Sequence, residues 1–441
     1  MRFDPFVVGP VVFGKDFLGR DSEVLGLLQR ISKGESTIIT GQPRIGTTSF
    51  LERLKDPAVQ KKYISAQKTQ NWSFFYVPCM GLGKSYTVAA FWRDALQDLS
   101  QNPRIPAIGD FLSVVRSSNY EPNKLRQLFE LLRQNKIQLI IMFDTFELLL
   151  SNASDEFKDI SFLGFLHDAS KRGGLSLVIS SRYQSNKLLS MTPRLPGSYL
   201  FSNTINIILK NFDANTIQKL LKRASPNFSN SEEMFIQRVS GSNPYLLQAM
   251  ASTMYNRRHD IEDSEANAAD TFYHGVKSHF LDIWDGLDEA EKTVSVILAV
   301  KSLSGIALGQ SYNYGEIERF DVYKPELLSL QRKGLAHIVE KTTRGWLFDS
   351  DHYLVWRSEK GGAEKWAMSC EAFVWWIEDE IIKTVRDIPA HDQWLRDKRN
   401  RGVITQKQWN DIKSLASKLP ASALQGAFSL AKYLWLEISK N

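Results

Sequence analysis

The sequence predicts an α/β fold in which a parallel sheet carries helices on both faces. Short runs rich in β-branched and aromatic residues recur along the first half of the chain, and amphipathic segments such as Val24–Ile31 and Lys124–Leu132 lie between them. Strands that alternate with helices favour a parallel, doubly wound sheet. The expected strands are Thr37–Thr40, Ser73–Val77, Gln138–Phe143, Ser176–Ser180 and Thr204–Leu209.

The first expected strand runs into a glycine-rich segment, Gly41-Gln-Pro-Arg-Ile-Gly46, and an apolar-periodic stretch follows it. This strand–loop–helix order with Gly-x-x-x-x-Gly spacing is typical of a P-loop. The glycines let successive backbone N–H groups turn toward phosphate oxygens at the positive end of the following helix. Thr48 stands where a hydroxyl group would ligate Mg²⁺. We therefore expect a P-loop NTPase domain over residues 1–209.

The loop lacks the lysine that normally precedes this hydroxyl residue, because Thr47 stands at that position. The strand before Asp144 is apolar, so we interpret Asp144 as the metal-side acid of an NTPase; a plain strand-end acid is the alternative. The next position, where an NTPase places a water-activating glutamate, is Thr145. Glu147 would replace that glutamate only if the chain bends, and a charge in the first turn of a helix is the simpler interpretation.

Two further segments carry groups that suit phosphate binding. Arg182 follows the fourth expected strand, where its guanidinium would reach a terminal phosphate, although a surface arginine is an equal alternative. Residues 78–85 resemble a second P-loop that keeps Lys84 and Ser85. Pro78 replaces the first glycine of that segment and has no N–H group to offer. We expect the loop at 41–46 to be the real site, with Lys84 as a substitute cation in an alternative scheme.

After residue 209 the strand pattern fades and helical signals take over. Asp213 is placed to cap one helix, and Pro244 would occupy the first turn of a later one. We therefore expect residues 210–285 to form a small helical lid.

Residues 286–360 show two helical segments followed by two strand-like segments. Asp288-x-x-Glu291 has the spacing of a capping box at the start of the first helix. The strand-like segments are Leu335–Glu340 and Trp346–Asp349, and residues 341–345 have the composition of a turn between them. Two helices and a β-hairpin predict a winged-helix domain.

Composition and charge restrict the class of protein. The 441 residues carry a net charge of +6, and the densest basic cluster, Arg396–Arg401, is interrupted by an acid and an amide. The two cysteines match no metal or redox spacing, and the start of the chain has no secretory pattern. No uncharged apolar run reaches membrane-spanning length. We expect a soluble cytoplasmic protein without a membrane partner.

Several motifs together suggest a family. Asp4-Pro-Phe-x-x-Gly9, Phe17-Leu-Gly-Arg20-x-x-Glu23 and the Gly-x-x-Arg-Ile-Gly form of the loop resemble the opening of STAND-class P-loop ATPases, within the wider AAA+ group. These are signal-transduction switches that include prokaryotic defence ATPases. Gly241–Gln248 is similar to the Gly-x-Pro region in the helical lid of that family. The resemblance extends over roughly residues 1–360.

The resemblance implies that the chain binds ATP or ADP with Mg²⁺, and that nucleotide exchange opens a closed molecule and promotes assembly. Arg44 and packing against adenine would help to retain the nucleotide where the lysine is missing. The implied site comprises Arg20 near the base, the phosphate-loop residues Gly41, Gly46, Thr47, Thr48 and Ser49, the acid Asp144, the phosphate-sensing Arg182, and Pro244 against the adenine.

Thr47 and Thr145 both depart from the family pattern, so we expect ATP hydrolysis to be very slow or absent. This favours a nucleotide-gated signalling switch or adaptor, in a prokaryotic defence or regulatory system. The helical periodicity of residues 361–441 predicts a small all-α C-terminal domain that binds other proteins. A nucleotide-dependent homo-oligomer is also expected.

Two alternatives stay open at this point. One is an active ATPase that recruits Lys84 or Arg44 in place of the missing lysine. The other is a winged-helix DNA-binding regulator with Lys341 and Arg344 in its wing. Its recognition helix around Leu327–Leu330 is mainly apolar, which suits packing better than reading a DNA groove, so we expect no nucleic-acid partner.

Overall fold

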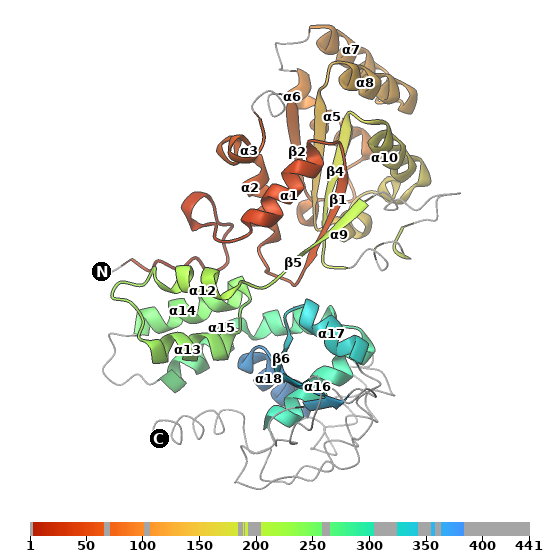
Figure 1. The fold of residues 1–441 in the computed structure, drawn as a ribbon. Coiled ribbons are helices and arrows are strands. Elements are labelled where there is room, and N and C mark those ends of the chain that lie inside the picture. Colours follow the sequence, from red (N-terminus) through yellow and green to blue (C-terminus); the bar gives the residue numbers. More distant parts are fainter. Residues whose placement is uncertain are drawn as a thin grey trace. The chain divides into compact units, whose positions relative to one another are not determined.

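The computed structural model describes residues 3–65, 71–100, 106–183, 188, 190–192, 204–257, 265–303, 324–342, 354–357 and 363–382. The chain divides into two compact units, shown as a ribbon in Figure 1. One unit is Val11–Leu209, and the other combines Met1–Pro10 with Lys210–Asn441. The division after Leu209 falls at the end of the last strand of the first unit, and the first ten residues group with the second unit.

The first unit is built on a five-stranded parallel sheet with the strand order β2-β3-β4-β1-β5. All five strands expected from the sequence are confirmed. The sheet and its helices have the α/β fold of a P-loop NTPase, with β1 leading into the glycine-rich loop. The strands are β1 (Ser36–Gly41), β2 (Trp72–Pro78), β3 (Gln138–Asp144), β4 (Leu175–Ser181) and β5 (Thr204–Leu209).

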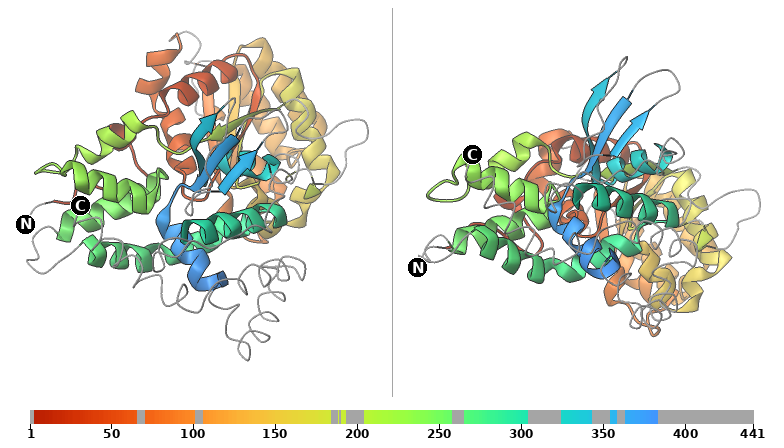
Figure 2. Two further views of the ribbon diagram at one scale, coloured as in Figure 1. Left: turned by 60° about the horizontal axis from the view of Figure 1, so that its bottom comes forward. Right: turned by 90° about the horizontal axis from the view of Figure 1, so that it is seen from below.

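Helices cover both faces of this sheet, as Figures 1 and 2 show, because its central strands are apolar on both sides. Along β3, Ile140 and Met142 join one buried cluster, whereas Leu139, Ile141 and Phe143 join the other. The Met142 face is covered by α1 (Asp21–Ile31), which follows the 3-10 turn η1 (Gly14–Asp16), and by α2 (Thr47–Lys55) and α3 (Pro57–Tyr63). The Phe143 face is covered by η2 (Cys79–Gly81), α5 (Val88–Ala95), α6 (Gln97–Ser100), α7 (Pro106–Ser117), α8 (Pro122–Gln134), α9 (Phe146–Asn152), η3 (Asp155–Lys158) and α10 (Ile160–Arg172).

In the second unit, the segment after Lys210 is helical, and the helix starts follow the sequence signals. The Asp213 carboxylate accepts a hydrogen bond from the Thr216 amide at 2.7 Å, which confirms the expected cap. Pro244 is the first residue of its helix, as expected. These helices are α12 (Ala214–Leu221), α13 (Asn230–Ser240), α14 (Pro244–Arg257) and α15 (Glu265–Asp285).

The expected capping box is present at the start of the next helix. The Asp288 amide donates to Glu291 Oε2 at 2.9 Å, and the Glu291 amide donates to Asp288 Oδ1 at 2.8 Å. Two helices then precede a three-stranded antiparallel sheet in the order β6-β8-β7, visible in the right-hand view of Figure 2. The elements are α16 (Glu289–Leu303), α17 (Lys324–Arg332), β6 (Ala336–Thr342), β7 (Leu354–Arg357), β8 (Ala363–Met368), α18 (Glu371–Ile377) and a π-helical turn (Glu378–Ile382).

The small sheet differs from the expected hairpin. β6 continues through Lys341 and Thr342, where the sequence favours a turn, and it pairs with β8. Since β8 begins at Ala363, this sheet crosses the expected boundary at residue 360, and the following segment is not all helical. The alternation of buried Glu364 and Trp366 with partly exposed Lys365 is a strand pattern that the helical interpretation overlooked. Two predictions lie outside the described residues, namely the strand Trp346–Asp349 and the helices after residue 382.

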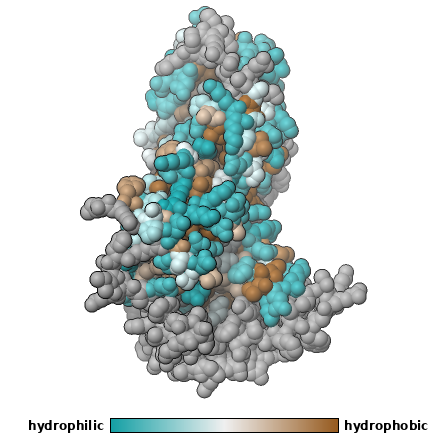
Figure 3. Space-filling view, turned by 60° about the vertical axis from the view of Figure 1, so that its left-hand side comes forward, coloured by the Kyte–Doolittle hydropathy of each residue, from teal (hydrophilic) through white to brown (hydrophobic). Residues whose placement is uncertain are grey.

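Within the described part of the chain, no helix is both long enough and apolar enough to cross a lipid bilayer. The face drawn in Figure 3 is mainly hydrophilic among its described residues, with apolar residues in small groups.

Candidate functional site

The glycine loop, residues 41–46, has the backbone shape of an anion-binding turn. A Cβ atom on Gly41 would lie 2.7 Å from the side chain of Ile45, so only glycine fits where the loop leaves β1. Arg44 and Gly46 both have positive φ angles, of 59° and 94°. Left-handed residues in such alternation turn backbone N–H groups to one side, as in the nests that bind phosphate. The loop ends at the N-terminus of α2, where the helix dipole adds positive charge.

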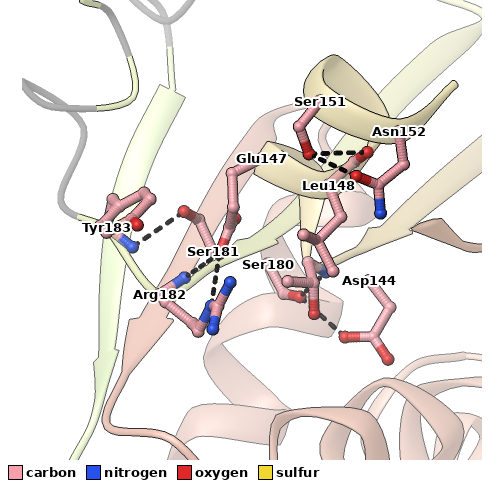
Figure 4. A network of polar contacts seen from close by, with 10 residues as sticks. Asp144, Glu147, Leu148, Ser151, Asn152, Ser180, Ser181, Arg182 and Tyr183 are labelled. Atoms are coloured by element: carbon pink, nitrogen blue, oxygen red, sulfur yellow. Dashed lines mark hydrogen bonds and ion pairs between the residues drawn. The ribbon is translucent and has the colours of Figure 1, made fainter. Parts of the chain in front are cut away.

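Next to this loop, three hydroxyl groups surround the carboxylate of Asp144, which ends β3 and is 9% exposed. Thr48 Oγ1 and Tyr76 OH each donate to Asp144 Oδ2 at 2.7 Å. Ser180 Oγ donates to Oδ1 at 2.9 Å, a bond drawn in Figure 4. We call Thr48, Tyr76 and Ser180 the hydroxyl cluster. Its members come from α2 and from the ends of β2 and β4, and all three contact Asp144.

Strand register explains this convergence. Pro78 of β2 pairs with Asp144, so Tyr76, two residues earlier, lies diagonally across from Asp144 on the same face of the sheet. Phe143 pairs with Ile179, so the next residues on the two strands, Asp144 and Ser180, are also neighbours. Tyr76 was missed by sequence reasoning because tyrosine is common in strands and only the pairing of β2 with β3 reveals its partner.

Tyr76 acts as a hydrogen-bond donor in this cluster. Burial raises the pKa of its phenol well above the ordinary value, and the hydrogen bond to Asp144 raises the pKa further. The hydroxyl group therefore stays protonated at physiological pH and donates its hydrogen to the Asp144 carboxylate.

Glu147 and Arg182 form a second polar contact beside the cluster, shown in Figure 4. Thr145 has a φ of 63° and turns the chain out of β3 into α9, so Glu147 lies in the first turn of a helix. Its Oε1 accepts from the backbone N and the Nε of Arg182, both at 3.1 Å. Glu147 is buried, whereas the Arg182 side chain is 44% exposed. A phosphate that attracted this guanidinium would therefore compete with Glu147.

The positions expected for catalysis carry neutral side chains in the structure. Thr47 is the first residue of α2, directly after Gly46. The Thr145 amide donates to Ser180 Oγ at 2.8 Å, which ties this residue to the hydroxyl cluster. Thr145, where the sequence pattern predicts a water-activating glutamate, therefore carries a neutral hydroxyl side chain.

Two other expected site residues are engaged in local contacts. Arg20 precedes α1 with a φ of 67°, and its nearly buried guanidinium lies 3.4 Å from the Glu23 carboxylate. The buried Ser49 hydroxyl accepts from the Val12 amide at 3.1 Å, so its side chain fixes the segment before α1.

Arg44 is exposed at the tip of the glycine loop, and Pro244 is a buried residue of the other unit. The nucleotide contacts expected of these residues stay predictions.

The second glycine-rich segment does not form a phosphate loop. β2 ends at Pro78 and continues into a 3-10 turn, and Lys84 Nζ lies 3.2 Å from Asp155 Oδ1 at an exposed position. β2 is also three strands away from β1, which at about 4.8 Å per strand is roughly 14 Å. This placement gives no support to Lys84 as a substitute for the missing lysine.

The groups around Asp144 are oxygen donors, and Mg²⁺ prefers oxygen ligands in octahedral geometry. Thr48 and Asp144 offer a hydroxyl and a carboxylate oxygen side by side, so the chemistry fits. Among the described residues, no group of at least three His, Cys, Asp or Glu side chains forms a further metal cluster.

No protein-family model matches the chain, and no curated protein sequence matches it. Among solved structures, the Walker-type ATPase PABY2304 of Pyrococcus abyssi is similar over 85% of this chain and 99% of its own, with 14% identity and a TM-score of 0.46. The ORC1 protein of Aeropyrum pernix, solved in complex with DNA, is similar over 84% of this chain and 94% of its own, with 12% identity and a TM-score of 0.35. The S. cerevisiae Hsp104:casein complex is similar over 74% of this chain and 50% of that chain, with 14% identity and a TM-score of 0.31.

Proposed function

We propose that this protein is a nucleotide-binding signalling switch or adaptor of the STAND ATPase type, with little or no hydrolysis. One observation carries the proposal: the glycine loop keeps its phosphate-binding shape, while Thr47 and Thr145 stand where an ATPase has its lysine and glutamate. ATP or ADP would bind through the loop N–H groups and the N-terminus of α2. A prokaryotic defence or regulatory system is the setting that the resemblance favours.

The two substitutions affect different steps. A hydrogen bond to a charged group contributes about 1.5–3 kcal/mol, so the missing ammonium group weakens phosphate binding without abolishing the backbone contacts. The missing glutamate removes the base that orients water, and the only nearby carboxylate on α9, Glu147, is paired with Arg182. Binding without turnover follows from this combination.

The remaining expected residues are proposed in supporting roles. Thr48 and Asp144 would hold Mg²⁺, which supplies charge to the β- and γ-phosphates when bound. Arg182 would approach the terminal phosphate, and Arg20 and Pro244 the base. The C-terminal helical region would bind partner proteins in the cytoplasm, and the nucleotide would control assembly.

The winged-helix DNA-binding alternative has less support. Lys341 of β6 lies 3.0 Å from Glu364, and Lys333, which follows α17, lies 2.6 Å from the buried Glu291. Lysines held by carboxylates inside their own domain contribute little to the neutralisation of DNA phosphates.

The test is to purify the full chain, identify any nucleotide that co-purifies, and measure ADP and ATP binding by calorimetry together with ATP turnover. We expect binding with negligible turnover. Robust turnover that Asp144→Asn abolishes would refute the degraded active site, and a lack of nucleotide binding would refute the switch.

A further inference from the structure

Three side chains donate hydrogen bonds to the Asp144 carboxylate, and these bonds affect how strongly the carboxylate can interact with a metal ion. An ionised carboxylate offers about four lone-pair positions. Thr48 and Tyr76 take both positions of Oδ2, and Ser180 takes one of Oδ1. About one position is left for a water molecule of a hydrated Mg²⁺.

We propose that Tyr76 and Ser180 hold Asp144 in hydrogen bonds that weaken its interaction with Mg²⁺, so that nucleotide binding to the glycine loop depends little on the metal ion. This inference rests on the proposed nucleotide-binding function and specifies how that site is loaded. Mg²⁺ keeps several waters when it binds a protein, and each of these waters needs an acceptor. Where hydroxyl groups fill the acceptor positions, few are left for the waters of Mg²⁺, so the carboxylate contributes little to binding of the metal ion.

Tyr76 is the residue on which this arrangement depends. Its phenol comes from the edge strand β2, its side chain is partly buried, and Lys55 Nζ lies 4.9 Å from the ring centroid. The ring fixes the position of the phenol oxygen beside Asp144, whereas the hydroxyl oxygens of Thr48 and Ser180 move by rotation about a single side-chain bond. Tyr76 is therefore a positioning residue that acts through Asp144.

The experiment measures the dissociation constant of ADP by calorimetry in Mg²⁺ and in EDTA, for the full chain and for Tyr76→Phe. For the natural chain we expect the two constants to agree within about threefold, which is less than one hydrogen bond. Tyr76→Phe frees a lone-pair position, and we expect Mg²⁺ then to strengthen binding by about five- to tenfold. Ser180→Ala is a second variant with the same expected direction.

Tyr86→Phe is the matched control, because this partly buried phenol of the same unit donates to Asp94 Oδ2 at 3.3 Å, outside the cluster. The ratio of its ADP dissociation constants in EDTA and in Mg²⁺ should equal that of the natural chain. A natural chain whose affinity for ADP falls by more than about threefold in EDTA would overturn the inference. So would a ratio that neither Tyr76→Phe nor Ser180→Ala changes. Absence of ADP binding in both conditions would instead refute the proposed function, and the inference with it.

Discussion

Restoring the missing lysine with Thr47→Lys should tighten nucleotide binding without creating an ATPase. Thr47 is the first residue of α2 and follows Gly46 directly, so a lysine there would place its ammonium group over the glycine loop. A charge-assisted hydrogen bond to phosphate contributes about 1.5–3 kcal/mol, which is roughly a 10- to 100-fold fall in the dissociation constant of ADP. ATP turnover should stay negligible, because Thr145 is unchanged.

The same substitution should destabilise the folded protein when no nucleotide is bound. A cation at a helix N-terminus opposes the helix dipole at a cost of about 0.3–1 kcal/mol. Thr47→Lys should therefore lower the free energy of unfolding of the empty protein and raise it again when ADP is added.

Calorimetry with ADP and thermal unfolding with and without ADP measure these two effects. Gln29→Lys, which adds the same charge on an exposed position of α1, is the control and should change neither quantity. If Thr47→Lys folds normally and binds ADP no more tightly than the natural chain, the glycine loop does not hold the phosphates and the reasoning fails.

Two further predictions concern groups beside the site and in the core. Glu147→Gln removes the ion pair with Arg182, so we expect the affinity for ATP relative to ADP to rise as the guanidinium is released. Competition binding measures this ratio, Glu130→Gln at the exposed Arg133 pair is the control, and an unchanged ratio would argue against phosphate sensing by Arg182. Burial raises the pKa of the Cys370 thiol to about 12 and also raises the pKa of the Cys79 thiol. Neither buried thiol should therefore react with a thiol reagent at pH 8 until the protein unfolds, and rapid labelling of the native protein would contradict this.

Local features of the sequence were sufficient for much of the fold. The strands were recognisable from β-branched runs, and the helix starts at Asp213 and Asp288 from capping residues, because such signals lie within a few consecutive residues. The glycine loop was recognisable for the same reason, since the positive φ of Gly46 and the close approach at Gly41 are requirements of single positions.

The C-terminal part was less predictable because its pattern is ambiguous over short stretches. β8 has only six residues, and its buried positions include the charged Glu364, which the sequence alone marks as exposed. Lys324 and Lys341 pair with this carboxylate from other elements, and that pairing makes its burial tolerable.

The sequence by itself determined that this chain contains a glycine loop on an α/β sheet and that Thr47 and Thr145 stand where the P-loop pattern predicts a lysine and a glutamate. Only the tertiary structure decided that Tyr76 and Ser180 meet Asp144, and that Lys84 pairs with Asp155 instead of serving the loop. The reason is strand order: parallel neighbours are joined through crossover connections, so the residues that share an acid are far apart in the chain and their register is set by long-range packing.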